Sequence, residues 1–299
     1  MTSRILSTSE GTNQQSFSAG DWGLFWSISV IWGASFVLMD IGLDAFGPGL
    51  ITLLRVGLGA SVLWFFPKTR VPVERADWPR LLALSIIWVA IPFTLFPIAQ
   101  QWINSALAGM LNGAMPIFAA AIASILLRRL PRGAQLAGVA IGFLGVVAIA
   151  SPSFGESSSE ALGVLLVLLA TVCYGLAVTI ATPIQQRYGS LPVMGRMLAL
   201  ATIWTAPLGV WDALDSTWQW DSFAAVATAG FLGTGLAFVI MGSLAGRVGS
   251  TRASFITYVI PVVALALGVI FRGDIVTTVS IIGVVLVIIG ALMASRSER

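Results

Sequence analysis

The side chains that most enzymes and metal sites use are scarce in this sequence. It has no histidine, one cysteine (Cys173) and one lysine (Lys68). The lack of histidine excludes Ser–His and Cys–His nucleophile pairs and most zinc sites. No GxxxxGK[ST] phosphate-binding loop is present, and no apolar segment carries a pair of carboxylates. We therefore expect no catalytic residue, no metal, no cofactor and no enzymatic activity.

The residues that could bind a ligand are polar and aromatic side chains in the middle of long apolar segments. Lipid-facing positions favour aliphatic side chains, so these residues are expected to face the protein interior. An aromatic lining with a few hydrogen-bonding groups is usual for small-molecule sites. The candidates for substrate binding are Trp32, Phe36, Trp88, Asn112, Met115, Tyr174, Thr257 and Tyr258. The other tryptophans lie near segment ends and are expected at the membrane interface.

Proline and glycine interrupt the same apolar segments. A proline removes one helical hydrogen bond and bends a membrane helix where neighbouring protein or water satisfies the freed group. Pro116 and Pro261 lie about 145 residues apart, each near the middle of its segment. We interpret them as a matched pair of bending points, and Pro92, Gly233 and Gly235 as further hinges.

Charged side chains within the apolar segments are few. Arg55 and Arg196 lie near segment ends, and we expect their long side chains to reach water, with pairing to a substrate carboxylate as the alternative. Asp40 is expected to be solvated at the end of the first segment. Since no Asp, Glu or His lies deep in a segment, the sequence does not indicate a proton relay.

The composition requires these residues to be positioned by membrane-spanning helices. The chain is 57% hydrophobic and 10% charged, whereas soluble domains carry about 25% charged residues. A span needs about 20 mostly apolar residues. Ten such segments are predicted, over 22–43, 48–66, 79–99, 104–127, 133–151, 161–185, 192–211, 222–244, 250–271 and 277–295.

The second half of the chain repeats the first. Residues 105–150 align without a gap on 250–295, which places Pro116 on Pro261, Gly138 on Gly283 and Gly145 on Gly290. Because each copy has an odd number of spans, the second copy must enter the membrane from the opposite side, as in inverted-repeat transporters. The predicted division is a cytoplasmic tail over 1–21, a first repeat over 22–151, an external linker over 152–160 and a second repeat over 161–296.

Charge placement orients the ten spans. Arginines and Lys68 gather on alternate links, and Arg272 is the one basic residue on the other side, which places both termini in the cytoplasm. The fifth and tenth spans carry no proline. Their glycines, such as Gly138 and Gly142, suit close helix contact, either within the chain or in a homodimer. The chain is expected to be a monomer or a homodimer.

Several of these residues together resemble a known family. Trp32-Gly33-Ala34-Ser35-Phe36 resembles the W-G-x-x-F opening of the EamA half of the drug/metabolite transporter superfamily. The fourth and fifth spans are similar to those of the family in carrying Ala108, Asn112, Pro116, Gly138, Gly142 and Gly145, and the second copy repeats Ala253, Pro261, Gly283 and Gly290. The resemblance covers residues 22–295 and extends to amino-acid exporters of the YddG type. One departure is Arg128-Arg129 where the family often has an acidic residue, although the second half keeps Asp274.

The resemblance implies a secondary transporter in the bacterial inner (plasma) membrane. It would export small metabolites, with neutral or aromatic amino acids as the expected substrates, by alternating access between inverted repeats. Its partners would be the small-molecule substrate and the lipid bilayer, with no nucleic acid. Two alternatives remain: an exporter of another solute, such as a drug cation or a nucleotide-linked sugar, and a channel or scaffold that does not transport.

Overall fold

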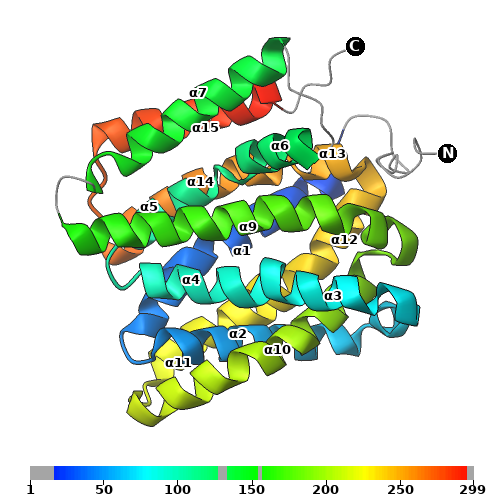
Figure 1. Ribbon diagram of the computed structural model, residues 1–299. Coiled ribbons are helices and arrows are strands. Elements are labelled where there is room, and N and C mark those ends of the chain that lie inside the picture. Colours follow the sequence, from blue (N-terminus) through cyan, green and yellow to red (C-terminus); the bar gives the residue numbers. More distant parts are fainter. Residues whose placement is uncertain (1–16, 127–132, 154–156, 295–299) are drawn as a thin grey trace.

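The computed structural model describes residues 17–126, 133–153 and 157–294, and every regular element in these ranges is helical (Figure 1). Most of the tail expected over 1–21, part of the linker expected over 152–160 and Arg128, Arg129 and Arg132 lie outside the described residues. Eight helices are long and apolar enough to span a membrane, and two shorter apolar helices complete ten crossings. The prediction of an all-helical membrane protein with ten spans is confirmed.

The helices of the first copy follow the predicted spans closely. They are α1 (Ala19–Leu43), α2 (Pro48–Phe65), α3 (Trp78–Leu84), η3 (Ser85–Ala90), α4 (Ile91–Ala99), α5 (Ser105–Asn112), α6 (Met115–Leu126) and α7 (Gly133–Ala150), with the short turns η1 (Pro67–Arg70) and η2 (Arg75–Asp77) between α2 and α3. The third span is thus α3, η3 and α4 in sequence, and the fourth is divided into α5 and α6.

The helices of the second copy have the same plan. They are α9 (Ser158–Tyr188), α10 (Ser190–Asp215), α11 (Trp220–Thr228), η4 (Ala229–Leu236), α12 (Ala237–Val248), α13 (Ser250–Ala253), α14 (Ile256–Leu267), η5 (Gly268–Arg272) and α15 (Thr278–Ala294). Its third span is α11, η4 and α12, and its fourth is α13, α14 and η5. The elements η3, η4 and η5 are π-helical, with one more residue per hydrogen-bonded turn than an α-helix.

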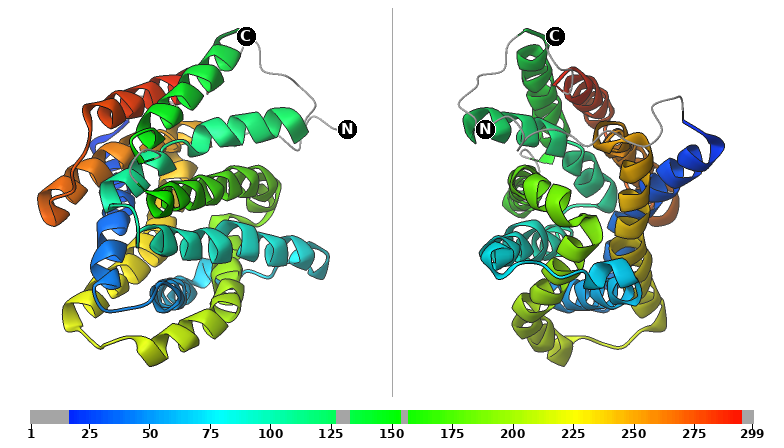
Figure 2. Two further views of the ribbon diagram at one scale, coloured as in Figure 1. Left: turned by 60° about the vertical axis from the view of Figure 1, so that its left-hand side comes forward. Right: turned by 90° about the vertical axis from the view of Figure 1, so that its right-hand side faces the viewer.

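The two copies do not form separate units, because helices of one copy pack along helices of the other. α2 lies along α10, α7 lies along α15, α1 packs on α14, and α9 packs on α6 (Figures 1 and 2). Each first helix therefore contacts the fourth helix of the other copy. The arrangement follows from the repeat, since equivalent helices carry equivalent apolar faces.

Two glycines allow these first-to-fourth helix contacts to be close. A Cβ atom at Gly33 of α1 would lie 2.7 Å from the Cβ atom of Val263 and 3.2 Å from the backbone nitrogen of Ala264. A Cβ atom at Gly175 of α9 would lie 2.8 Å from the backbone nitrogen of Ala119 on α6. Ala119 and Ala264 are equivalent positions of the repeat. The Trp-Gly and Tyr-Gly pairs thus make the same contact in both copies.

Glycines also form the seam between α7 and α15. A Cβ atom at Gly138 would lie 2.6 Å from the Gly290 carbonyl oxygen, and one at Gly145 would lie 2.7 Å from the Gly283 carbonyl oxygen. Small residues let backbones approach in this way without a hydrophobic driving force between helices in lipid. The glycine face predicted on the fifth and tenth spans is therefore used within the chain.

We expect Gly290→Ala to destabilise the protein by about 1–3 kcal/mol, the usual cost of overpacking. The added methyl group would meet backbone atoms of Gly142 and the Gly138 carbonyl oxygen, which cannot rotate away. The thermal stability of the detergent-purified protein, followed by size-exclusion chromatography after heating, measures this effect. Gly246→Ala is the matched control, because its Cβ atom would meet nothing within 4 Å. Equal melting of the two variants would contradict the proposed importance of the seam.

Candidate binding cavity

A cavity with a volume of about 150 Å³ lies inside the bundle, where helices of both copies converge. One water molecule needs only about 10–15 Å³ of such volume, so the cavity can accept a small organic molecule. Its lining comes from α1, α2, η3, α4, α5, α6, α9, η4, α12 and α14. The lining residues are Trp32, Ser35, Phe36, Met39, Arg55, Trp88, Phe93, Phe96, Asn112, Met115, Tyr174, Gly233, Phe238, Thr257 and Ile260.

Most of the residues proposed from the sequence as substrate contacts meet at this cavity. Trp32, Phe36, Trp88, Asn112, Met115, Tyr174 and Thr257 all belong to its lining. Tyr258 does not. Its hydroxyl donates to the Ala291 carbonyl oxygen of α15 at 3.2 Å, and its ring packs beside Phe255. We therefore withdraw Tyr258 from the candidate site, because the helical rotation between positions 257 and 258 turns it toward α15.

The internal repeat is visible in the cavity wall. Asn112 and Thr257 are equivalent positions, and Phe93 and Phe238 stand at the same spacing of 145 residues. The pair at 115 and 260, Met and Ile, also lines the cavity from both copies. Phe93 was among the mid-span aromatic residues that the sequence brought forward, whereas Phe238 was missed, although a second phenylalanine 145 residues after Phe93 was a signal that could have found it.

Two π-helical segments contribute to the wall. η3 contains Trp88 and η4 contains Gly233, which occupy equivalent repeat positions, and the Trp32 indole nitrogen donates to the Gly233 carbonyl oxygen at 2.9 Å. π-helical turns are rare and occur frequently at functional sites. Gly233 and Gly235 both lie within η4, and Pro92 follows η3 at the start of α4. The proposed hinges are thus at irregular points of their helices, and their motion stays a prediction.

Pro116 and Pro261, which are equivalent in the repeat, lie at different points of their helices. Pro116 lies in the first turn of α6, directly after the interruption that separates α5 from α6, whereas Pro261 lies inside α14. The second copy is interrupted earlier, at Ser254 and Phe255, so the two prolines lie at different distances from the break in their spans, and their role as bending points stays a prediction. Both prolines nevertheless lack the N–H that would bond the carbonyl four residues before. Those carbonyls belong to Asn112 and Thr257, which line the cavity.

Arg55 does not reach water. It is 7% exposed, and its Nε atom donates to Thr234 Oγ1 at 3.1 Å while Nη1 lies 3.0 Å from the Met39 sulfur. The expectation that it extends to solvent is wrong, because α2 is enclosed between α10 and η4 at this level. Arg196, its counterpart in the second copy, is half-buried and donates to the carbonyl oxygens of Thr69 and Pro192.

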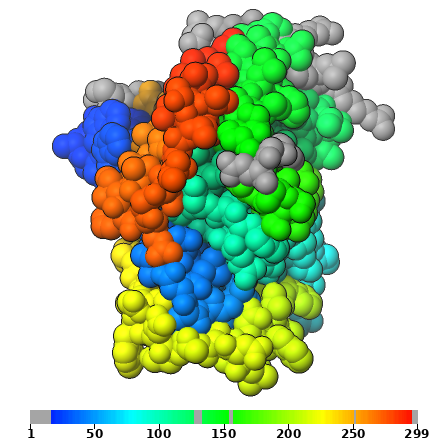
Figure 3. All heavy atoms as spheres, turned by 90° about the vertical axis from the view of Figure 1, so that its left-hand side faces the viewer, coloured from blue at the N-terminus to red at the C-terminus, as the bar shows by residue number. Residues whose placement is uncertain are grey.

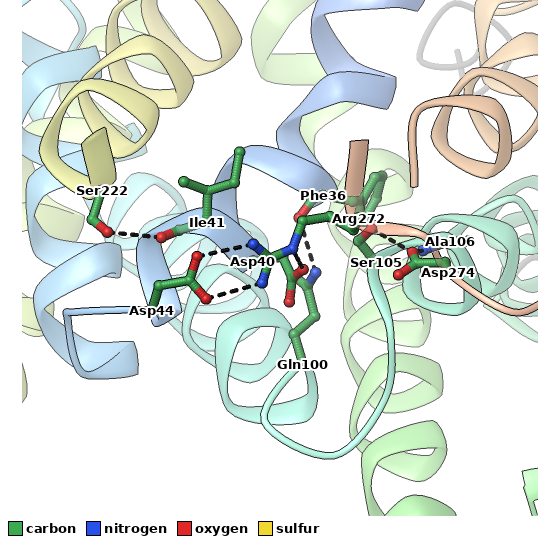
Figure 4. A network of polar contacts seen from close by, with 10 residues as sticks. All are labelled: Phe36, Asp40, Ile41, Asp44, Gln100, Ser105, Ala106, Ser222, Arg272 and Asp274. Atoms are coloured by element: carbon green, nitrogen blue, oxygen red, sulfur yellow. Dashed lines mark hydrogen bonds and ion pairs between the residues drawn. The ribbon is translucent and has the colours of Figure 1, made fainter. Parts of the chain in front are cut away.

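Polar contacts hold together the distal face, defined as the face at which α1 ends and α5 begins. Arg272 forms ion pairs with Asp40 and Asp44, so that Asp40 is paired rather than simply solvated (Figure 4). In the same network, Gln100 donates to the Phe36 carbonyl oxygen at 2.9 Å (Figure 4). These contacts fasten the ends of α1, α4 and η5 to one another.

The start of α5 is buried in this distal face. Its residues from Ser105 to Leu111 are all buried, and Asp274 accepts hydrogen bonds from the Ser105 hydroxyl and the Ala106 N–H at 2.7 and 2.8 Å. In the space-filling view, atoms fill the centre of the face (Figure 3). The equivalent stretch of the second copy lies at the opposite face, and there Ser254 and Phe255 are exposed. The two ends of the bundle are therefore packed differently.

Among the described residues, no group of three or more His, Cys, Asp or Glu side chains could hold a metal ion. The tryptophans near the ends of the spans, including Trp22, Trp64 and Trp220, are exposed, as expected of interfacial residues.

Comparison with known proteins agrees with this architecture. A solved structure that is 21% identical superposes with a TM-score of 0.63 and covers 93% of this chain and 97% of its own, which supports the fold. A "probable amino-acid metabolite efflux pump" of Escherichia coli is 25% identical over 276 residues, 88% of this chain and 90% of the relative. A "probable terminal-alkyne amino-acid exporter" of Streptantibioticus cattleyicolor is 25% identical over 284 residues, 92% of this chain and 93% of the relative.

The profile of the EamA-like transporter family matches residues 21–151 and again residues 161–296. The two matches correspond to the two copies of the repeat, and together they cover nearly the whole chain. This chain belongs to the EamA-like transporter family.

Proposed function

We propose that the protein exports neutral or aromatic amino acids across the inner membrane, and that the central cavity is their binding site. The observation that carries the proposal is the aromatic wall at the junction of the two copies. Trp88, Phe93 and Tyr174 come from the first and second copies around one space, with further rings from α1, α4 and α12. Such a wall suits an apolar or aromatic side chain. Relatives named as amino-acid exporters support the same substrate class.

Alternating access follows from the inverted repeat. With the termini in the cytoplasm, as the charge placement predicts, the distal face is external, and the state described here has that face packed shut. In the opposite state, the start of the second copy's fourth helix would pack as residues 105–111 pack here, and the Arg272 ion pairs would separate. The π-helical segments and the break before Pro116 supply the points at which the helices bend.

The alternative substrates fit the cavity less well. The one permanently charged side chain in the described lining is Arg55, and no carboxylate lines it. A drug cation would meet repulsion there. A nucleotide-linked sugar carries a diphosphate, for which this lining offers a single cationic side chain.

Counterflow in proteoliposomes tests the proposal. Vesicles loaded with unlabelled phenylalanine or leucine are expected to take up the labelled amino acid in a saturable manner, faster than empty vesicles do. If no labelled amino acid exchanges, the amino-acid assignment is wrong while the family remains. Uptake that rises linearly with concentration and ignores the internal amino acid would instead indicate a channel.

Within that assay, Trp88→Ala is expected to raise the half-saturating concentration of phenylalanine about tenfold, because a large buried aromatic contact is lost. Trp211→Ala is the matched control, since this tryptophan is exposed on α10 and does not line the cavity. Tyr258→Phe should likewise leave the half-saturating concentration unchanged. If either control raised the half-saturating concentration more than Trp88→Ala does, the cavity would not be the binding site.

A further inference from the structure

We infer that Arg55 binds the carboxylate of the transported molecule, so that a free carboxylate is a requirement for recognition. This inference rests on the proposed function in taking the central cavity as the substrate site, and it narrows the substrate class to carboxylates such as zwitterionic amino acids. The relevant observation is a buried arginine that lines the cavity and has no acidic partner among the residues that the structure describes.

A buried charge without a counter-ion is costly, so its retention requires a reason. The contacts of Arg55 are all neutral: the Thr234 hydroxyl, the Met39 thioether and the Phe93 ring, whose centroid lies 4.4 Å from the guanidinium carbon. Arg55 forms no ion pair with a described residue, whereas the arginines at 80, 187, 247 and 272 each pair with a carboxylate. The positive charge of Arg55 is therefore not neutralised by the protein that surrounds it.

The guanidinium group of Arg55 also has hydrogen-bond donors that the described protein does not use. It has five N–H donors in a planar fork, and its described hydrogen bonds use Nε and Nη1. Nη2 has no hydrogen-bond partner among the described residues. Such a fork matches a carboxylate, which can accept two parallel hydrogen bonds from it.

The surrounding structure fixes the orientation of this fork. The Thr234 hydroxyl donates to the Ala229 carbonyl oxygen at 3.2 Å, so its oxygen remains available to accept from Arg55 Nε. Both residues belong to the π-helical η4, and the Phe93 ring lies against the guanidinium plane from α4. Preorganisation of this kind lowers the entropy cost of binding.

A second cavity residue suits the other end of an amino acid. The Asn112 side-chain oxygen is buried and has no hydrogen-bond partner in the described structure. An oxygen acceptor fits an ammonium N–H and not a carboxylate. Arg55 and Asn112 both line the aromatic cavity, and the Asn112 amide would have to turn toward the space for its oxygen to meet an ammonium group.

Competition against labelled phenylalanine in the counterflow assay tests the role of Arg55. In the wild-type protein, unlabelled phenylalanine should compete, and phenylalanine amide and phenethylamine should compete about 10- to 100-fold more weakly, the range expected for lost charge-assisted hydrogen bonds. Arg55→Gln should weaken phenylalanine to the level of the amide and so abolish the difference. Arg55→Lys, which keeps the charge but loses the fork, should restore part of the preference for the carboxylate. Arg196→Gln, which changes the counterpart outside the cavity, should keep the full preference.

Binding to the purified protein separates this inference from the proposed function. Thermal stabilisation by 3-phenylpropionate, which has a carboxylate but no amine, should occur in the wild type and not in Arg55→Gln. If amino acids are not exchanged but this stabilisation depends on Arg55, the proposed substrate is wrong and the inference stands. If amino acids are exchanged and Arg55→Gln keeps the preference for phenylalanine over its amide, the inference is overturned and the proposed function stands.

The stability of the ligand-free variant provides a further readout. Because Arg55 has no counter-ion, Arg55→Met should melt at the same temperature as the wild type or higher, since an uncompensated buried charge is removed. A purely structural arginine would give the opposite result. A clear loss of stability in Arg55→Met, with the carboxylate preference retained in Arg55→Lys and Arg55→Gln, would contradict the inference.

Discussion

Close backbone contact between the two copies is the interaction on which the rest of the structure depends. In a bilayer, apolar side chains gain little by leaving lipid for protein, so helix association relies on packing at short range. The chain achieves this with glycines on both sides of each contact: Gly138 with Gly290, and Gly145 with Gly283. The first helix of each copy uses a single glycine, Gly33 or Gly175, against the fourth helix of the other. None of these contacts forms within one copy, so neither copy is complete by itself.

The uninterrupted helices α7 and α15 do not line the cavity, whereas the interrupted third and fourth spans surround it together with α1, α2 and α9. α7 and α15 are uninterrupted, whereas the third and fourth spans of both copies contain π-helical turns, breaks or prolines. Backbone groups freed by such irregularities cannot be left in lipid, and they are tolerated where protein or a water-accessible space receives them. Trp32 satisfies one of them, the Gly233 carbonyl oxygen, and Thr52 satisfies another, that of Phe93. The irregular helices can therefore exist in the membrane because their freed backbone groups face the cavity or other parts of the protein.

Much of this could be predicted from the sequence because lipid imposes simple rules on it. The ten helices could be predicted from span length, the positions of basic residues and the repeat. Much of the cavity wall could be predicted from the aromatic and polar residues in the middle of the spans. The burial of Arg55 was not predicted, because its distance from the end of a span does not reveal which helices enclose it, and its pairing with a substrate carboxylate was only the alternative. Tyr258 was misplaced because one residue along a helix turns a side chain by about 100°. Both errors concern the rotation and burial of a helix, which depend on neighbours far away in the chain.

The exchange of Trp88 for Gly233 at one repeat position has a consequence for the bound molecule. The Trp88 indole forms part of the cavity wall in one copy, whereas Gly233 in the other copy has no side chain and its carbonyl oxygen accepts a hydrogen bond from the Trp32 indole. The two sides of the cavity therefore differ in shape. A ligand that fits against the indole has one preferred orientation, and it would keep that orientation while the helices around it exchange roles. Under the alternating access proposed above, the molecule would therefore cross the membrane without turning over.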